Sequence, residues 1–324
     1  MVFAEGANSP LVWPAPPAAA RIQYVKSIAT VKDVEGKKGV FGRIWDMIVG
    51  DEQVQLRKPM GVAVDGDGGW VAVADPAEKR VHVFDQKNGS YWAITSIDKL
   101  ALDHPMAVAS DGKGTLYVAD SGRGEVYRMT GARTLSKVYG GKGVLKRPTA
   151  VAVNSVGGRL YVTDTPEHNI KVFDLGDGTL KGTIGSRGTL DGQLNYPSYL
   201  AVDAHGNLYV TDALNGRIQV FDQEGRFVRR IGQHGDGSGD FSAPKGVALD
   251  SDGHLYVADA DFDNVQIFNN EGRLLLFFGS SGQGPGRFWM PTGLAMDLND
   301  RLYVADSYNK RIQVFQYLKE AVER

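Results

Sequence analysis

The sequence of 324 residues contains no cysteine. This absence excludes disulfide bonds, thiolate metal ligands, a cysteine nucleophile and, in this form, a thioether lipid anchor. No apolar run approaches the roughly 18 residues that a membrane-spanning helix needs. Residues 1–4 are too short for the apolar core of a signal peptide. We therefore expect the chain as written to be soluble.

The sequence also lacks an excess of positive or of negative charge. The 36 lysine and arginine residues face 38 aspartate and glutamate residues, which gives a formal net charge of -2. This balance provides no overall attraction to nucleic acid or to anionic lipid. Hydrophobic residues make up 42% of the chain and charged residues 23%. These fractions are typical of a globular protein with a large core.

What the sequence does contain is a sixfold internal repeat. A proline followed by a short apolar strand recurs at intervals of 43 to 49 residues, at Pro59, Pro105, Pro148, Pro197, Pro244 and Pro291. A second strand ends in aspartate each time, at Asp75, Asp120, Asp164, Asp212, Asp259 and Asp306. A third strand follows a polar loop, clearest at 215–221 and 309–315, and a fourth follows a glycine turn, as at 225–232. Each repeat therefore predicts a four-stranded antiparallel meander.

Six such meanders predict an all-β fold, a six-bladed β-propeller, because radial packing buries both faces of every blade. Along the first strand, branched residues alternate with small ones, so that the two sets face opposite sides. The small residues are Ala63, Ala109, Ala152, Ala201, Ala248 and Ala295. The last repeat has no fourth strand, whereas residues 21–28 resemble the end of a repeat. We predict that this N-terminal strand completes the last blade and closes the ring.

The predicted domain organisation is a Pro/Ala-rich tether at 1–20, one propeller at 21–318 and a tail at 319–324. The alternative for the tether is a strip that lies over the propeller. An insert at 32–56 follows the closing strand, and its residues 39–50 predict a short amphipathic helix. One face of that helix is formed by Phe41, Ile44, Trp45 and Ile48. This face either packs on the propeller as core or binds a partner.

The segments 212–221 and 306–315 share the pattern Asp-x-x-Asn-x-Arg-Ile-Gln-Val-Phe, and each follows Tyr-Val-Thr or Tyr-Val-Ala. This pattern resembles the NHL repeat family, and the resemblance covers roughly residues 55–317. The first two repeats depart from it, since 74–80 lacks the asparagine and 121–126 lacks both the asparagine and the usual arginine.

The order of proline-rich stretch, closing strand and Phe-Gly-Arg insert is similar to bacterial periplasmic or surface-lipoprotein NHL propellers. This resemblance implies an extracytoplasmic location, in the periplasm or at the cell surface. In those relatives a signal peptide and a lipidated cysteine precede the tether, and this sequence shows neither. Attachment to a membrane is therefore expected only through a tether that this sequence lacks.

Propeller ligands sit over the central channel, so the expected contacts are the residues that follow each proline. These are Met60, Met106, Thr149, Ser198, Tyr199, Lys245 and Thr292. Related six-bladed amidating lyases and gluconolactonase-like enzymes place a metal near this channel mouth, on histidine or on carboxylate and asparagine ligands. No histidine or carboxylate stands at these positions, and a metal needs such ligands. We therefore expect no catalytic residue, no metal and no cofactor there.

The aspartate that ends each second strand is the best carboxylate constellation in the sequence. Six such groups suggest weak calcium binding as one interpretation. The other interpretation is structural, since an aspartate at a repeated turn caps backbone N–H groups and pairs with arginine, here Arg80, Arg217 or Arg311. We favour the structural interpretation.

These observations favour a monomeric, non-catalytic binding or scaffold propeller, which presents a loop face or the 39–50 insert to a protein or peptide. The first alternative is a metal-dependent lyase or lactone hydrolase with its site at the channel mouth. The second is single-stranded RNA binding, an activity of some NHL propellers, on the basic strands at 226–230 or 142–147. The balanced total charge argues against nucleic acid.

Overall fold

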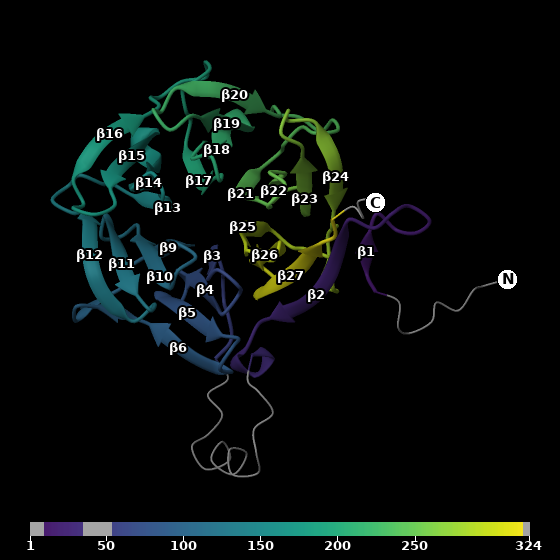
Figure 1. Ribbon diagram of the computed structural model, residues 1–324, viewed down its shortest axis with the longest axis horizontal. Helices are drawn as coiled ribbons and strands as arrows, with labels where there is room; N and C mark the ends of the chain where they lie inside the picture. The colour runs from purple at the N-terminus through teal and green to yellow at the C-terminus, as the bar shows by residue number, and fades with distance from the viewer. Residues whose placement is uncertain (1–9, 35–53, 320–324) are drawn as a thin grey trace, which may run out of the picture.

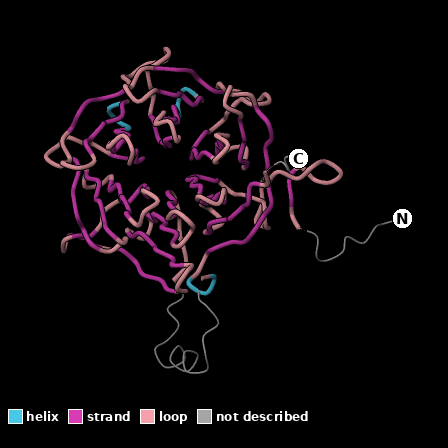
Figure 2. Tube along the Cα trace, viewed as in Figure 1, coloured by secondary structure: helices cyan, strands magenta, loops and turns pink. Residues whose placement is uncertain are grey.

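The computed structural model describes residues 10–34 and 54–319, which form six β-sheets arranged radially around a central axis (Figure 1). In each sheet the strands pair antiparallel, from an inner strand near the axis to an outer strand at the rim. The helical segments among the described residues are three short 3-10 turns, η1 (Val31–Asp33), η2 (Thr165–Glu167) and η3 (Ala213–Asn215) (Figure 2). The predicted all-β, six-bladed propeller is confirmed.

Each blade consists of four strands that follow one another in the chain, except the last. Blade one contains β3 (Gly61–Val64), β4 (Trp70–Asp75), β5 (Arg80–Asp85) and β6 (Ser90–Ile94). Blade two contains β9 (Pro105–Ser110), β10 (Thr115–Asp120), β11 (Glu125–Thr130) and β12 (Thr134–Gly140), and a hairpin of β7 (Ser96–Ile97) and β8 (Leu100–Ala101) precedes it. Blade three contains β13 (Pro148–Asn154), β14 (Arg159–Asp164), β15 (Asn169–Asp174) and β16 (Leu180–Ile184).

The second half of the ring repeats this plan. Blade four contains β17 (Pro197–Val202), β18 (Leu208–Asp212), β19 (Arg217–Phe221) and β20 (Phe227–Ile231). Blade five contains β21 (Pro244–Leu249), β22 (Leu255–Asp259), β23 (Asn264–Phe268) and β24 (Leu274–Phe278). Blade six contains β25 (Pro291–Met296), β26 (Arg301–Asp306) and β27 (Arg311–Tyr317), followed in space by the N-terminal strand β2 (Ile22–Ile28).

The N-terminal strand closes the ring, as the sequence predicts. Strand β2 pairs antiparallel with β27, from Ile22 opposite Tyr317 to Ile28 opposite Ile312. A short strand β1 (Val12–Trp13) then pairs with β2 and gives the sheet a fifth strand. The Trp13 ring lies 5.5 Å from that of Phe278 in blade five. Part of the stretch before the closing strand therefore lies on the propeller.

The core consists of layers between neighbouring blades. On the inner strand of blade one, Val62 packs in a buried cluster with Ile28 and Ile312 of blade six. The next residue, Ala63, belongs to a different buried cluster, together with Leu116 of blade two. Successive residues of one strand thus face opposite neighbours, as the period-2 pattern predicts. Every blade depends on the blades at both sides for the burial of its apolar residues.

The inner strands approach one another so closely that some positions accept only glycine. A Cβ atom on Gly293 of blade six would lie 2.5 Å from the Met60 carbonyl oxygen of blade one. A Cβ atom on Gly246 would lie 2.5 Å from the Leu294 amide nitrogen. The ring leaves a central channel of about 210 Å³, lined by residues of the six inner strands. We call the end at which the inner strands begin the channel-mouth face, and the end with the turns between first and second strands the opposite face.

The closing strand makes a testable contribution to stability. The Ile28 side chain is fully buried between blades six and one, so Ile28→Ala should lower the free energy of unfolding by about 2 to 5 kcal/mol. In the same strand Val25 is 46% exposed, so Val25→Ala should change it by less than about 0.5 kcal/mol. Urea denaturation monitored by tryptophan fluorescence measures both values. Equal losses in the two variants would show that β2 is not part of the core.

Candidate functional site

The predicted channel-mouth residues lie at the starts of the inner strands, where the structure uses several of them internally. Thr292 is only 3% exposed, and its one hydroxyl hydrogen is shared between the carbonyl oxygens of Pro59 and Ala305, which lie 3.2 and 3.3 Å from Oγ1. The Thr149 Oγ1 lies 3.0 Å from the Thr163 Oγ1 within blade three. These two hydroxyls join inner strands to their neighbours, so the mouth offers fewer ligand-binding groups than the sequence suggests.

Tyr199 fills part of the mouth itself. It occupies the repeat position that holds glycine or alanine in the other five blades, where the inner strands come closest. Burial raises the pKa of the Tyr199 phenol above its ordinary value, and the neighbouring Thr292 side chain opposes part of this shift. Thr292 belongs to blade six, so the phenol of blade four lies near a side chain of a blade that is not its direct neighbour.

The other predicted mouth residues do not provide a metal site. Met60, Met106 and Ser198 carry no charge, and the one charged group, Lys245, is a cation that repels a metal ion. Over residues 10–34 and 54–319, no three histidine or acidic side chains converge in a group that could hold a metal. The residues present at the mouth therefore do not fit the divalent metal of gluconolactonase-like propellers.

The six strand-ending aspartates serve as caps for the loops of the channel-mouth face. Each is fully buried and accepts backbone N–H groups from the residues just before the inner strand of its own blade. Asp164, for example, accepts from the amides of Lys146 and Arg147 at 2.8 and 3.0 Å. Each carboxylate is directed at its own loop, so the six do not converge on one cation. These contacts are structural.

The predicted pairing with arginine is present in two blades and absent in the first. The Nε of Arg217 donates to Asp212, and that of Arg311 to Asp306, each at 2.8 Å. Arg80 instead pairs with Glu78, at 3.2 Å, so the expected Asp75–Arg80 pair is wrong. The reason is local, because blade one has a glutamate in this loop where blades four and six have asparagine.

Blade one also has a buried histidine where blades four and six have glutamine. His82 is fully buried, and its Nδ1 lies 2.9 Å from the Tyr91 hydroxyl. The Nε2 has no hydrogen-bond partner and lies 3.9 Å from Asp75. Burial lowers the pKa of His82 to about 4, although the nearby Asp75 carboxylate opposes this shift. The imidazole is therefore neutral at physiological pH.

An exposed aromatic pair on the channel-mouth face was missed by the sequence reasoning. The rings of Trp289 and Tyr308 stack with centroids 5.5 Å apart and an interplanar angle of 29°. The two residues are 46% and 48% exposed. The Lys58 ammonium of blade one lies 5.7 Å from the centre of the Tyr308 ring. The sequence did contain a signal for this pair, because each of the two loops of blade six on this face contains an aromatic residue.

Backbone contacts hold this pair in place. The Trp289 N–H donates to Asp306 at 2.8 Å, and the Tyr308 N–H donates to the Trp289 carbonyl oxygen at 3.1 Å. Beside the pair, a cavity of about 630 Å³ is lined by Arg57, Lys58, Lys310 and Glu78, among others. The predicted insert residues Phe41, Ile44, Trp45 and Ile48 lie outside the described residues. The candidate site is therefore the exposed aromatic pair with its adjoining basic cavity.

Comparison with known families agrees with this architecture. The family model described as SMP-30/Gluconolactonase/LRE-like region matches residues 45–233. The chain belongs to this family. NHL repeat models match residues 241–268 and 288–315, in blades five and six. The two family matches together cover most of the propeller, and the NHL match in blade six includes the pattern at 306–315.

Individual relatives match only parts of the chain. Protein brain tumor of Drosophila melanogaster is 37% identical over 91 residues, which is 28% of this chain and 9% of that protein. The E3 ubiquitin-protein ligase NHLRC1 of Rattus norvegicus is 30% identical over 112 residues, 35% of this chain and 28% of that protein. The chain thus spans less than a third of the length of either relative.

Among solved structures, an auxiliary nutrient binding protein from Bacteroides thetaiotaomicron superposes with a TM-score of 0.62 at 15% identity. The match covers 82% of this chain and 70% of that one. At this identity the likeness shows the fold alone. No helix in the described parts of the chain is long and apolar enough to span a membrane.

The buried histidine of blade one predicts a pH-dependent stability. Because the unfolded chain binds a proton near pH 6.5 and the folded chain only near pH 4, acidification through this window favours unfolding. At pH 5 the free energy of unfolding is therefore lower by about 2 kcal/mol than at neutral pH. His82→Gln should remove this loss, since a glutamine here can donate to Asp75 as Gln313 donates to Asp306.

Urea denaturation of both proteins at pH 7.5 and pH 5.0 measures the effect. His205→Gln is the matched control, because His205 is exposed in a turn of blade four and should retain the wild-type pH dependence. The same loss of stability in wild type and His82→Gln between the two pH values would show that His82 is not responsible.

Proposed function

We propose that this chain is a binding propeller that takes a protein or peptide partner on its channel-mouth face. The observation that carries the proposal is the exposed, stacked pair of Trp289 and Tyr308. Tryptophan and tyrosine dominate the energetics of protein interfaces, because a rigid ring buries a large area at a small cost in side-chain entropy. A pair held by backbone hydrogen bonds is already ordered before a partner arrives.

The charges beside the pair define the chemistry of the partner. Lys58 and Lys310 line the adjoining cavity and are both exposed, whereas Arg57 pairs with Glu78 at 3.1 Å. A peptide with an apolar or aromatic side chain for the rings and an acidic side chain for the two lysines satisfies both features. We infer an acidic, aromatic-containing peptide segment as the partner.

The named relatives support a binding role. One relative is an E3 ubiquitin-protein ligase, and a protein of the same fold is an auxiliary nutrient binding protein. A scaffold role and an extracytoplasmic location belong to the same proposal. The proposal also includes the 39–50 insert as a second contact surface, because this segment follows the strand that closes blade six.

The experiment begins with selection of peptides from a displayed library of random 12-residue sequences on the wild-type protein. Selected peptides should be acidic and should contain an aromatic residue. Trp289→Ala and Tyr308→Ala should each raise the dissociation constant about tenfold to a hundredfold, as for residues at the centre of an interface. Fluorescence anisotropy of labelled peptides measures the change. Both side chains are about half exposed, so the fold should tolerate the substitutions.

Leu298→Ser is the matched control, because Leu298 is 79% exposed on the opposite face. It should leave peptide affinity unchanged. The proposal fails if no peptide is enriched, or if selected peptides bind the Trp289 and Tyr308 variants as well as wild type. It also fails if a single-stranded RNA 20-mer binds this face more tightly than any peptide, because stacked aromatics beside lysine also suit nucleobases.

Metal-dependent hydrolysis of a lactone, or a lyase reaction, is the second candidate, and membership of the gluconolactonase-like family favours it. The channel-mouth residues argue against it, because Lys245 and two internally bonded threonines stand where metal ligands are needed. We therefore expect that protein purified without chelators contains less than stoichiometric zinc and calcium by mass spectrometry. One equivalent of either metal, lost together with a lactonase activity on dialysis against chelator, would favour the enzyme.

A further inference from the structure

The cavity beside the aromatic pair has more positive than negative charge. Among the described residues that line this cavity of about 630 Å³, four side chains are cationic and one, that of Glu78, is anionic. The cationic side chains are those of Arg57, Lys58, Arg80 and Lys310. The buried Asp75 carboxylate accepts the backbone N–H groups of Arg57 and Lys58. Even with Asp75 counted, an excess of two positive charges remains.

The one anionic group of the lining is shared between two guanidiniums. The Nε of Arg57 lies 3.1 Å from Oε1 of Glu78, and the Nε of Arg80 lies 3.2 Å from Oε2. His82, at 3.7 Å from the same carboxylate, is neutral because burial lowers its pKa to about 4. One negative charge therefore faces two positive ones, and Glu78 neutralises the guanidiniums only in part.

The two lysines of the cavity have no carboxylate partner. Within the parts of the chain that the structure describes, neither ammonium forms an ion pair or a hydrogen bond, and that of Lys58 contacts the Tyr308 ring. Lys310 is exposed, and its backbone has a φ of 57°, a left-handed conformation that favours glycine. The equivalent residue of blade four is Gly216. A side chain is thus present at this position in spite of its backbone cost, as is common at binding sites.

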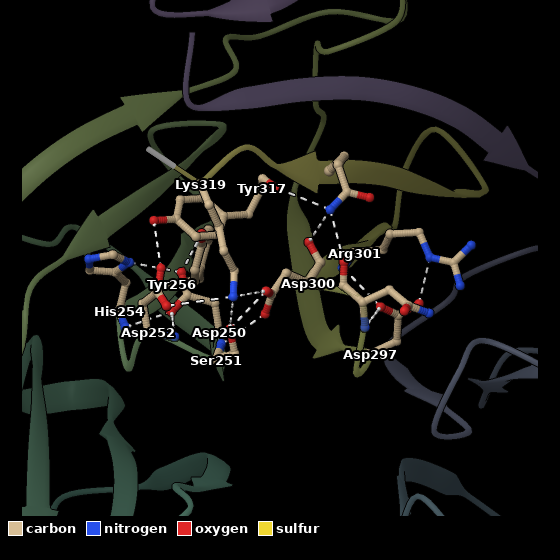
Figure 3. A network of polar contacts seen from close by, with 12 residues as sticks. Asp250, Ser251, Asp252, His254, Tyr256, Asp297, Asp300, Arg301, Tyr317 and Lys319 are labelled. Carbon is tan, nitrogen blue, oxygen red and sulfur yellow. Dashed lines mark hydrogen bonds and ion pairs between the residues drawn. The ribbon is translucent and has the colours of Figure 1, made fainter. Parts of the chain in front are cut away.

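A charged cavity on the opposite face shows the contrast. It has a volume of about 740 Å³, lies between blades five and six, and is lined by Lys319 and Leu275 among others. The Lys319 ammonium donates to the Ser251 hydroxyl at 2.7 Å, and it pairs with Asp300 and Asp252 at 3.2 and 3.6 Å (Figure 3). That cation is satisfied within the protein, whereas the two lysines beside the aromatic pair have no such partners.

Two unbalanced positive charges are complementary to a dianion. A carboxylate supplies one negative charge, whereas a phosphate monoester carries about 1.5 to 2 negative charges at neutral pH and has three acceptor oxygens. Clusters of cationic side chains are a recurring means of recognising phosphorylated segments. The Lys58 ammonium lies 5.7 Å from the centre of the Tyr308 ring, so a phosphate at Lys58 is next to the aromatic pair.

We propose that this cavity binds a phosphate monoester among Arg57, Lys58 and Lys310, and that in the peptide partner this group is a phosphorylated side chain. This specificity rests on the proposed function, because the phosphate belongs to the peptide that contacts the aromatic pair. Binding is non-covalent, and no bond is made or broken. Glu78 competes for the guanidiniums, so the cavity prefers a dianion to a monoanion.

The first test needs no peptide. It compares phenyl phosphate, a ring with a dianion, and benzoate, a ring with one charge, by isothermal titration calorimetry on the whole chain at pH 7.5. We expect one saturable site for phenyl phosphate and about tenfold weaker binding of benzoate. Lys310→Gln should weaken phenyl phosphate binding about fivefold or more, because it removes a cation without another partner. Glu78→Gln should tighten it about threefold, because it removes the competing carboxylate.

Lys79 provides the matched control. It holds the same repeat position in blade one with a φ of 52°, and its ammonium already pairs with Asp103 at 3.0 Å. Lys79→Gln should therefore bind phenyl phosphate like wild type. The proposal is overturned if phenyl phosphate does not saturate, if benzoate binds as tightly, or if the Lys79 and Lys310 variants lose affinity alike. Unchanged or weaker binding by Glu78→Gln also contradicts it.

The second test uses a peptide selected on the wild-type protein, with its acidic residue replaced in turn by glutamate and phosphoserine. The phosphoserine peptide should bind about tenfold more tightly than the glutamate peptide at pH 7.5. This ratio should fall about fourfold at pH 5.5, where about a quarter of the phosphate remains a dianion. Equal affinities of the two peptides would overturn the phosphate proposal and leave peptide binding intact. Saturable phenyl phosphate binding without any enriched peptide would assign the cavity to free phosphate esters and refute only the proposed function.

Discussion

The closure of the ring is the constraint on which the rest of this structure depends. Every blade buries apolar residues against both neighbours, so blades one and six remain unpaired unless the ends of the chain meet. The pairing of β2 with β27 brings them together, and the Trp13 ring extends the contact onto blade five. Closure also places the N-terminal segment beside β27, where it forms one wall of the cavity between blades five and six.

Within the closed ring, the buried aspartates determine the shape of the channel-mouth face. A buried carboxylate is costly unless its oxygens are hydrogen-bonded, and here each accepts amides from the loop before an inner strand. The same contact that stabilises the blade therefore fixes the loop. Asp306 is the example at the candidate site, because it accepts the amide N–H of Trp289 and so fixes the loop that carries one ring of the exposed aromatic pair. The repeat supplies a rigid frame, and the loop side chains differ from blade to blade.

The axis itself is an unfavourable place for chemistry in this chain. The channel is lined mainly by small and branched residues, Tyr199 stands at its mouth, and the threonines there bond to neighbouring strands. The exposed aromatic pair instead lies off the axis, where blades six and one meet on the channel-mouth face. Fold alone does not determine function, and the family description includes gluconolactonase-like proteins, so the proposed binding role rests on the side chains of the aromatic pair.

The sequence by itself determined the number of blades, the four-stranded meander, the closing strand and the positions of the six aspartates. Periodicity carries this information because each repeat has the same local hydrogen bonds and the same alternation of faces. Only the tertiary structure decided which side chains from different blades come together. Lys58 meets Tyr308, Tyr199 reaches Thr292, and Lys319 completes the cavity beside Leu275. These contacts depend on the rotation between blades, and no spacing within a single repeat encodes that rotation. Arg80 is a smaller example of a contact that the repeat did not predict, because it pairs with Glu78 in its own loop and not with Asp75.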